Sequence, residues 1–314
     1  MASSPPPLAA DTPVAAVQAR LQWADDQGIW PTGRRYLWTD SFGVTLLVTL
    51  AETLGDPSYL DRAEVVVDDV DRVLGRRPGY RIGEASDRYG QYFHYLTVWA
   101  FALGVLGRHR PAHRDRAVRL IREVHPRFVL PGRGIWWKMR EDLSGPADGF
   151  GLGALDPYQA LAVYRFLDAG TGDLADEIAQ VADLVEASWR SLVIHQDLGL
   201  GMMLWSAARC AEDPWAQEHR SRSLAVLDSM WVDPPGYFCR EPGHPEVRFA
   251  FTNYGVAIGL QAVGERPDRV GGVLSYFDSY RSGDEYDREA ITHVMGCVAR
   301  LPGPFVPDRQ PTEG

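Results

Sequence analysis

Two aspartates stand where polar sequence gives way to an apolar stretch, a position that suits proton transfer. Asp40 follows Trp38 at the start of the apolar segment 36–54, and Asp197 opens the apolar run 197–208. An aspartate there can cap the free amides of a helix. In a partly apolar pocket the same carboxyl can act as a general acid or base, because burial raises its pKa toward neutrality. Asp40 fits both interpretations equally, whereas a helix start is the better explanation of Asp197.

Three further carboxylates differ in how well a structural role explains them. Asp156 stands directly before Pro157, a common helix start, so we interpret it as a cap. Asp142 and Asp148 lie in the long irregular stretch 127–154, where no capping role is evident. Connections of this length inside a domain are often functional. One of these two, or Asp197, is therefore the candidate partner of Asp40.

Two histidines lie about one turn inside predicted helices. His94 follows Tyr89 and Gln91 at the entrance of the apolar segment 89–107, and His293 has a similar depth in the segment 286–303. A buried histidine is often structural, but a polar cluster of this kind is costly to bury without a ligand or a network. In a closed ring the last hairpin returns beside the first. His94 and His293 could then line one side of a cavity together with Asp40.

Aromatic side chains gather in the loops and helix entrances at the same predicted end, where they suit the walls of a site for a flat ligand such as a sugar ring. Lys138, the only lysine of the chain, follows a tryptophan pair and could bind an anion. No phosphate-binding loop accompanies it. The predicted substrate-binding residues are Trp38, Tyr89, Gln91, Trp136, Trp137, Lys138, Tyr158, Tyr237, Asn253 and Tyr254.

The elements that would hold these residues alternate between two kinds of helix. Segments apolar all round, such as 36–54 and 89–107, are followed by segments with a single apolar stripe, such as 61–75. Twelve helices and no strand are predicted. Six such hairpins bury their apolar members best in a ring, so we expect an all-α (α/α)6 barrel in one domain over residues 13–303. A flexible leader (1–12) and a loose tail (304–314) would flank it.

Loop lengths predict which end of the ring carries the function. Turns from apolar to striped helices are short, whereas the long connections run from striped to apolar helices. The long connections would all emerge where the apolar helices begin. Helix amino termini at that mouth favour anions and carboxylates.

Composition excludes several classes of partner. The 314 residues carry a formal net charge of -10, which argues against nucleic acid or an anionic membrane as partner. The three cysteines have no metal-binding or disulfide spacing, and no apolar segment approaches the roughly 18 uncharged residues that a membrane span needs. We predict a cytoplasmic protein without metal, cofactor or membrane span. The oligomeric state is left open.

The segment WTDSFGVTLLVTLAETLGDPSYLDRA resembles the repeat unit of six-hairpin glycosidase-like proteins, which include unsaturated glucuronyl and rhamnogalacturonyl hydrolases. In those hydrolases an aspartate at a Trp-x-Asp helix entrance protonates the substrate, and the resemblance implies this role for Asp40. The N-acylglucosamine epimerase group shares the barrel and uses paired histidines, for which His94 and His293 are the candidates.

Three functions follow from these observations. The first is a glycoside hydrolase acting on a small saccharide, with Asp40 as general acid and a second carboxylate about 6.5–9.5 Å away. The second is a sugar epimerase or isomerase that uses two facing histidines. The third is a ligand-binding or terpenoid-cyclase-like toroid without hydrolytic activity. Fold alone does not decide among them.

Overall fold

The helix α2 (Leu37–Leu54) shows how the apolar segments are buried. In this computed structural model, which describes residues 4–238 and 240–307, every residue of α2 from 37 to 51 is buried. Its hydroxyl groups are satisfied within the helix: Ser41, Thr45 and Thr49 each donate to the carbonyl four residues earlier, at 2.7, 3.0 and 2.9 Å. Gly55 then ends the helix with a φ of 65°, a conformation that glycine adopts without strain.

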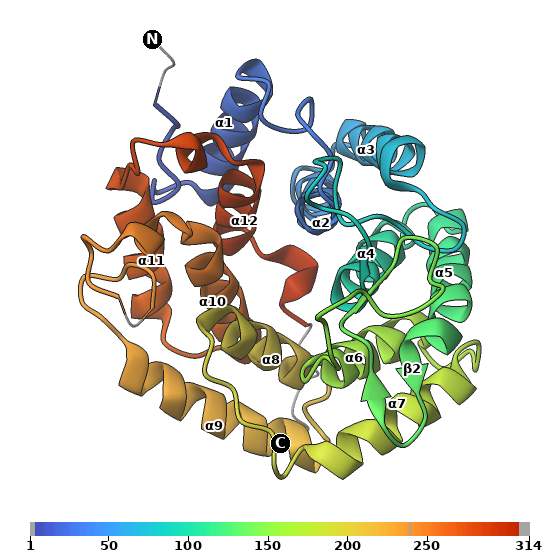
Figure 1. Ribbon diagram of the computed structural model, residues 1–314. Helices are drawn as coiled ribbons and strands as arrows, with labels where there is room; N and C mark the ends of the chain where they lie inside the picture. The colour runs from blue at the N-terminus through green and yellow to red at the C-terminus, as the bar shows by residue number, and fades with distance from the viewer. Residues whose placement is uncertain (1–3, 239, 308–314) are drawn as a thin grey trace, which may run out of the picture.

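Twelve α-helices in the described residues form a closed ring of hairpins (Figure 1). The inner helices are α2, α4 (Phe93–Leu106), α6 (Asp156–Asp168), α8 (Asp197–Arg209), α10 (Ala250–Val263) and α12 (Ala290–Arg300). The outer helices are α1 (Pro13–Asp26), α3 (Ser58–Leu74), α5 (Ala112–Phe128), α7 (Ala175–Ser188), α9 (Pro214–Met230) and α11 (Pro267–Ser279). Each inner helix packs against the next, and α12 packs against α2. The predicted (α/α)6 barrel in one domain is confirmed.

Glycines let two inner helices approach more closely than the others. A Cβ atom at Gly201 on α8 would lie 2.4 Å from the carbonyl oxygen of Gly255 on α10. A Cβ atom at Gly259 would lie 2.2 Å from the carbonyl oxygen of Gly201. Side chains at these positions would push α8 and α10 apart and open the ring.

The prediction of no strand is wrong in a small way. Four two-residue strands form two antiparallel pairs: β1 (Gln91–Tyr92) with β4 (Lys138–Met139), and β2 (Val129–Leu130) with β3 (Gly134–Ile135). Three of them belong to the long stretch after α5. Three 3-10 turns, η1 (Pro245–Arg248), η2 (Glu285–Arg288) and η3 (Gly303–Phe305), complete the structure.

Both chain ends differ from the expected loose segments where they are described. Leu8 is fully buried in the core, and the Pro6 carbonyl accepts a hydrogen bond from Arg20 at 2.6 Å. The Phe305 ring packs against rings of three inner helices, at 4.7 Å from Phe42, 5.3 Å from Phe101 and 5.8 Å from Trp205. The described part of the tail thus enters the middle of the ring of helices (Figure 1). Apolar side chains thus anchor both segments. The leader and tail predictions for residues 1–3 and 308–314 lie outside the described residues.

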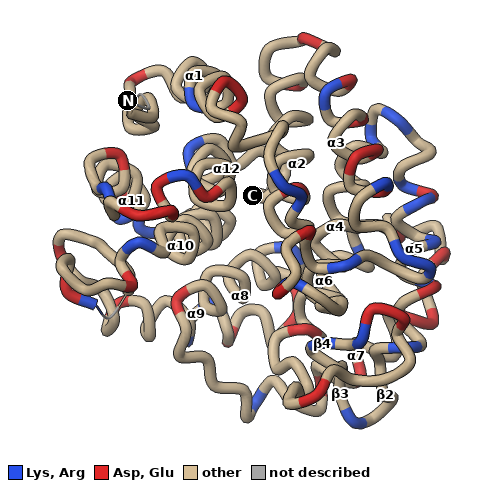
Figure 2. The backbone as a smooth tube through the Cα atoms, turned by 45° about the horizontal axis from the view of Figure 1, so that its top comes forward, with Lys and Arg blue, Asp and Glu red and all other residues tan. Residues whose placement is uncertain are grey.

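Charged residues concentrate on the outside of the ring. In Figure 2 the inner helices are mostly tan, whereas red and blue segments mark the outer helices and the loops. None of the described helices is long and apolar enough to cross a membrane. Cys210 and Cys297 are buried free thiols, and Cys239 lies outside the described residues.

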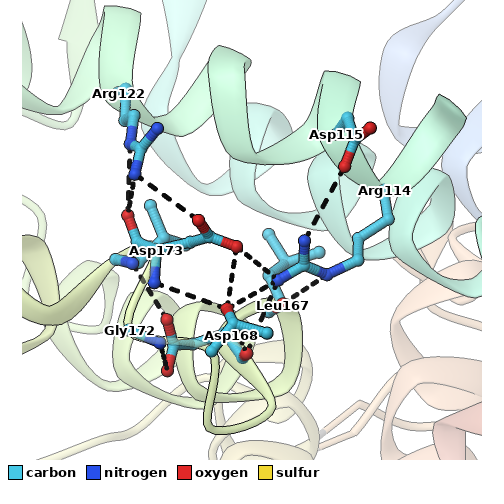
Figure 3. Close-up of polar contacts among 9 residues, drawn as sticks. Arg114, Asp115, Arg122, Leu167, Asp168, Gly172 and Asp173 are labelled. Atoms are coloured by element: carbon cyan, nitrogen blue, oxygen red, sulfur yellow. Dashed lines mark hydrogen bonds and ion pairs between the residues drawn. The ribbon is translucent and has the colours of Figure 1, made fainter. Parts of the chain in front are cut away.

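The turn from α6 to α7 is held by a buried carboxylate, shown in Figure 3. Asp168 accepts hydrogen bonds from the backbone amides of Leu174 at 2.9 Å and Gly172 at 3.2 Å. Arg114 of α5 donates to the Leu167 carbonyl at 3.0 Å and pairs with Asp173 at 2.8 Å. One carboxylate therefore orders the six-residue turn that joins the two helices of this hairpin.

We expect Asp168→Ala to lower the free energy of unfolding by about 1–3 kcal/mol, because two amides lose their acceptor. Chemical denaturation followed by circular dichroism measures this loss. Asp176→Ala, an exposed acid in the first turn of α7, is the matched control and should change stability much less. Equal stability of the two variants would contradict the role assigned to Asp168.

Candidate active site

The entrance of α4 is the most elaborately built part of the mouth. The pairing of β1 with β4 brings residues of the long stretch after α5 against the start of α4, with Tyr92 opposite Lys138. The amide of Phe93 donates to the Trp137 carbonyl at 3.2 Å. This pairing places Trp137 directly beside the first turn of an inner helix.

His94 lies within a group of aromatic rings at this entrance. Its imidazole centroid is 5.9 Å from that of Trp38, 4.8 Å from Tyr95 and 6.1 Å from Trp137. The Trp137 ring is nearly parallel to the imidazole, at 13°. The His94 side chain keeps 23% of its surface exposed, so a ligand at the mouth can reach it.

A carboxylate faces the imidazole. Nδ1 of His94 lies 3.6 Å from Oδ1 of Asp156, the first residue of α6. Neither atom has a hydrogen-bond partner among the described residues, although both are buried. A small movement would give the Nδ1–H···O bond that fixes an imidazole tautomer and leaves Nε2 as the base. His94 and Asp156 are therefore candidates for a base and its orienting group.

The structure places Asp40 differently from the exposed general acid that the hydrolase hypothesis requires. Asp40 is completely buried. Its Oδ1 accepts a hydrogen bond from the Trp30 indole at 3.0 Å and lies 3.2 Å from Nη1 of Arg35. Its Oδ2 accepts from the Tyr36 amide at 3.2 Å. These three groups occupy both oxygens and tie the start of α2 to the preceding loop.

Burial is the main influence on the titration of Asp40. It raises the pKa of the carboxyl from 3.8 to about 6, against the lowering effects of Arg35 and the Trp30 indole. Such a value would suit a general acid, but the carboxyl has no accessible surface. A perturbed pKa at a sealed site reflects burial rather than contact with a substrate.

The two loop acids proposed as partners lie on the surface. Asp142 is exposed and accepts a hydrogen bond from the Ser144 amide at 3.0 Å, which closes a turn. The Asp148 side chain is 96% exposed and lies 3.2 Å from Arg140. The structure does not bring either acid into contact with Asp40.

Asp197 begins α8, the inner helix next to that of Asp156. It is buried, and its Oδ2 has no hydrogen-bond partner in the described part of the chain. Burial raises the pKa of the Asp197 carboxyl, with a hydrogen bond to Thr252 acting in the opposite direction. Asn253 is likewise buried, and its amide donates to the Thr252 hydroxyl at 3.3 Å. These groups form a second polar cluster at the starts of α8 and α10.

The second predicted histidine lies in other surroundings. The His293 ring packs edge-on against Trp23 of the outer helix α1 at 4.8 Å, and Nε2 lies 2.9 Å from the Asp287 carbonyl. Burial lowers the pKa of His293 to about 4. None of the aromatic rings that contact His94 contacts His293. The structure therefore does not show the expected pair of facing imidazoles.

The predicted substrate-binding residues divide into two groups. Trp38, Trp137, Tyr89 and Lys138 lie around the α4 entrance: the Lys138 ammonium sits 4.1 Å from the Tyr89 ring centroid and 4.6 Å from that of Phe150. Burial lowers the pKa of Lys138. Tyr92 lies between these residues and His94, and its ring centroid is 5.2 Å from that of the imidazole.

The second group has structural partners. The Gln91 side chain accepts from the Tyr80 amide at 2.8 Å and donates to the Pro78 and Glu141 carbonyls. Tyr158 packs against Trp215 on α9, and Tyr254 against Phe277 on α11. The remaining two aromatics lie in loop segments: Trp136 is bridged to Leu152, and Tyr237 packs 6.2 Å from Phe249.

Sequence reasoning missed Tyr92 and Tyr95, and it favoured a helix-capping role for Asp156. Asp156 precedes a proline and was explained by helix capping alone, although its position at an inner helix start matches that of Asp197. Tyr92 and Tyr95 flank His94 in the sequence and also surround it in space. The aromatic density of the sequence QYFHY was the available signal. No group of metal-binding side chains occurs among the described residues.

Comparison with known proteins gives structural neighbours only. No family model matches this chain, and no curated protein matches it. The cellobiose 2-epimerase of Spirochaeta thermophila superposes with a TM-score of 0.57 at 12% identity, covering 87% of this chain and 86% of that one. The cellobiose 2-epimerase of Bacillus thermoamylovorans gives 0.55 at 10% identity, with coverage of 83% and 75%. A sugar epimerase from a ruminal bacterium gives 0.53 at 12% identity, with coverage of 84% and 75%.

These superpositions establish the fold that the chain shares with the sugar epimerases. At 10–12% identity they carry no residue roles. The function must therefore be argued from the side chains at the mouth.

Proposed function

We propose that the chain is a carbohydrate-active enzyme that epimerises or isomerises a reducing saccharide by proton transfer at His94. The observation that carries this proposal is the accessible imidazole at the ring mouth, whose Nδ1 faces the Asp156 carboxylate at 3.6 Å. Three structural neighbours are sugar epimerases with this barrel, which supports the same class of chemistry.

The chemistry requires a base that can reach a carbon-bound proton next to a carbonyl group. In the open-chain form of a reducing sugar, His94 Nε2 takes the proton from the carbon beside the aldehyde. The resulting imidazolium is stabilised by Asp156, while the substrate becomes an enediolate. Return of a proton to the opposite face of the same carbon gives the epimer. Return to the former aldehyde carbon, with the proton of the neighbouring hydroxyl passing to the former aldehyde oxygen, gives the ketose. The reaction is balanced without an added oxidant or reductant.

Asp197 is the candidate for the second proton donor. It starts α8, the inner helix that packs against α6, and burial raises the pKa of its carboxyl, so it retains a proton at higher pH than an exposed aspartate does. The aromatic rings of Trp38 and Trp137 beside the imidazole suit the apolar face of a sugar.

Hydrolysis is less well supported. The inverting mechanism needs an accessible acid and a second carboxylate about 6.5–9.5 Å away, with water between them. Asp40 is sealed by Trp30, Arg35 and Tyr36, and both loop acids are exposed on the surface.

A product assay separates the two functions. The protein is incubated with cellobiose and with a panel of reducing monosaccharides, and the products are separated by chromatography. We expect an epimer or a ketose of unchanged mass from at least one sugar. Release of glucose from cellobiose without any epimer or ketose would instead support the hydrolase.

A further inference from the structure

A pocket of 220 Å³ lies between the starts of α2 and α12, beside the candidate active site. Its volume is below the roughly 300–1,000 Å³ of pockets that enclose a whole drug-sized ligand. It is therefore the size of a subsite. Its lining residues come from the loop before α2 and the first turn of α2, the loop before α4, and the stretch from the end of η2 to the start of α12.

The pocket is rich in arginine. Four line it, namely Arg34, Arg35, Arg88 and Arg288, with Glu289 as the single carboxylate in its wall. The charge of Arg35 is already paired, because its Nη1 lies 3.2 Å from Oδ1 of Asp40 behind the pocket wall. The other three arginines outnumber Glu289, so the pocket carries net positive charge. Guanidinium groups are the preferred partners of carboxylates and phosphates.

Two of these arginines have room to bind a ligand. Arg34 is exposed and has no hydrogen bond or ion pair from its side chain in the described structure. The Arg88 guanidinium lies over the Tyr36 ring at 4.2 Å, a contact that leaves its N–H groups available. Arg288, by contrast, already donates to the Gln27 carbonyl at 2.9 Å.

An unused hydroxyl points independently to a ligand. Thr39 lines the pocket, is 2% exposed, and its Oγ1 has no hydrogen-bond partner among the described residues. Ser41 and Thr45 on the same helix donate to the carbonyl four residues earlier. Thr39 does not, and the carbonyl of Arg35 accepts the Glu84 amide at 3.0 Å instead. A buried hydroxyl without a partner is costly, and a bound anion would satisfy it.

The pocket is linked to His94 by a tyrosine pair. Tyr36 lines the pocket, and its hydroxyl is hydrogen-bonded to that of Tyr95. The Tyr95 ring lies 4.8 Å from the His94 imidazole. One pair of phenol rings thus separates the arginines from the candidate base. A substrate that contacts both His94 and the arginines must therefore reach past this tyrosine pair.

We infer that this pocket is a subsite for an anionic substituent of the substrate, a carboxylate or a phosphate, so that the preferred saccharide is an acidic sugar. This inference rests on the proposed function for its choice of ligand. It assigns Arg34, Arg88 and Thr39 to binding, and it predicts discrimination against neutral sugars.

Direct binding tests the inference without requiring turnover. Isothermal titration calorimetry compares glucuronate, glucose 6-phosphate, glucose and inorganic phosphate. We expect at least one acidic sugar to bind tenfold or more tightly than glucose. The tighter of the two acidic sugars distinguishes a carboxylate subsite from a phosphate subsite. Equal affinity for charged and neutral sugars, or inorganic phosphate binding as tightly as the acidic sugars, would overturn the inference.

Variants locate the binding site. Arg88→Gln should weaken binding of the acidic sugar about tenfold, and Thr39→Val about threefold, without changing glucose binding. Thr39→Val preserves side-chain shape, so it tests the site even if Arg88→Gln is unstable. Arg133→Gln, an exposed arginine in the turn between β2 and β3, removes the same charge elsewhere and should bind like the unchanged protein. Acidic-sugar binding that both pocket variants leave intact would contradict the assignment.

Failure here and failure of the proposed function give different results. An epimerase of neutral sugars that shows no preference for acidic ones would overturn this inference alone. A protein that binds acidic sugars through Arg88 and Thr39 but converts none of them would overturn the proposed function and leave the subsite in place.

Discussion

Replacing His94 with asparagine is expected to lower the rate of epimerisation or isomerisation by about 10²–10⁴-fold, the usual contribution of a general base. Asparagine keeps a polar side chain at the position but cannot accept and return the proton. Initial rates with the best sugar of the panel measure the effect. Circular dichroism and thermal unfolding show whether the variant has retained the fold.

A second histidine provides a matched control. His109 lies in the turn after α4, where its Nε2 is 2.8 Å from Glu52 on the surface. His109→Asn removes the same chemical group away from the ring mouth and should leave the rate unchanged. A folded His94→Asn variant with full activity would reject His94 as the base.

Removal of the Asp40 carboxylate is expected to produce the largest loss of stability. Asp40→Ala leaves the guanidinium of Arg35 buried without its ion-pair partner. Breaking a buried pair in this way costs about 3–5 kcal/mol. Denaturant titration at pH 7 measures the free energy of unfolding. An unchanged free energy of unfolding would contradict the structural role assigned to Asp40.

The titration of Asp40 also predicts how stability depends on pH. Its pKa is raised by burial from 3.8 to about 6 in the folded chain. Between these values the folded state binds more protons than the unfolded state, so the contribution of Asp40 to stability falls as the pH rises through this window. The full difference corresponds to ~3 kcal/mol. Asp40→Asn should remove this part of the pH dependence, and an unchanged slope would contradict the assignment.

The fold could be predicted because the apolar helices differ so clearly from the striped ones. The helix α2 is buried on all sides over four turns. In a chain of this length, the inside of a ring is one of the few positions that can bury a helix in this way. The outer helix α3 buries a single stripe, as its spacing of valines predicts. Loop lengths then indicated the mouth. The two kinds of helix and the loop lengths can both be recognised from residues that are close together in the sequence.

The site could be predicted only in part, because its contacts join separate hairpins. His94 was identified as a candidate, but its partner Asp156 lies 62 positions further on and is brought near it by the packing of α4 against α6. Asp40 was overvalued because its sequence neighbours do not reveal how Trp30 and Arg35 enclose its carboxylate. Similarly, the depth of His293 in its helix was visible, whereas the direction of its side chain toward Trp23 was not.

The central claim is that a carbon-bound proton is abstracted beside His94, and solvent deuterium measures this most directly. The protein is incubated in deuterium oxide with cellobiose, glucose, glucuronate or glucose 6-phosphate, and proton NMR follows the signal of the hydrogen on C2. We expect loss of that signal with at least one of these sugars, accompanied by an epimer or ketose, and no loss with the His94→Asn variant. Full retention of the C2 hydrogen in every sugar, or loss that persists without His94, would contradict it.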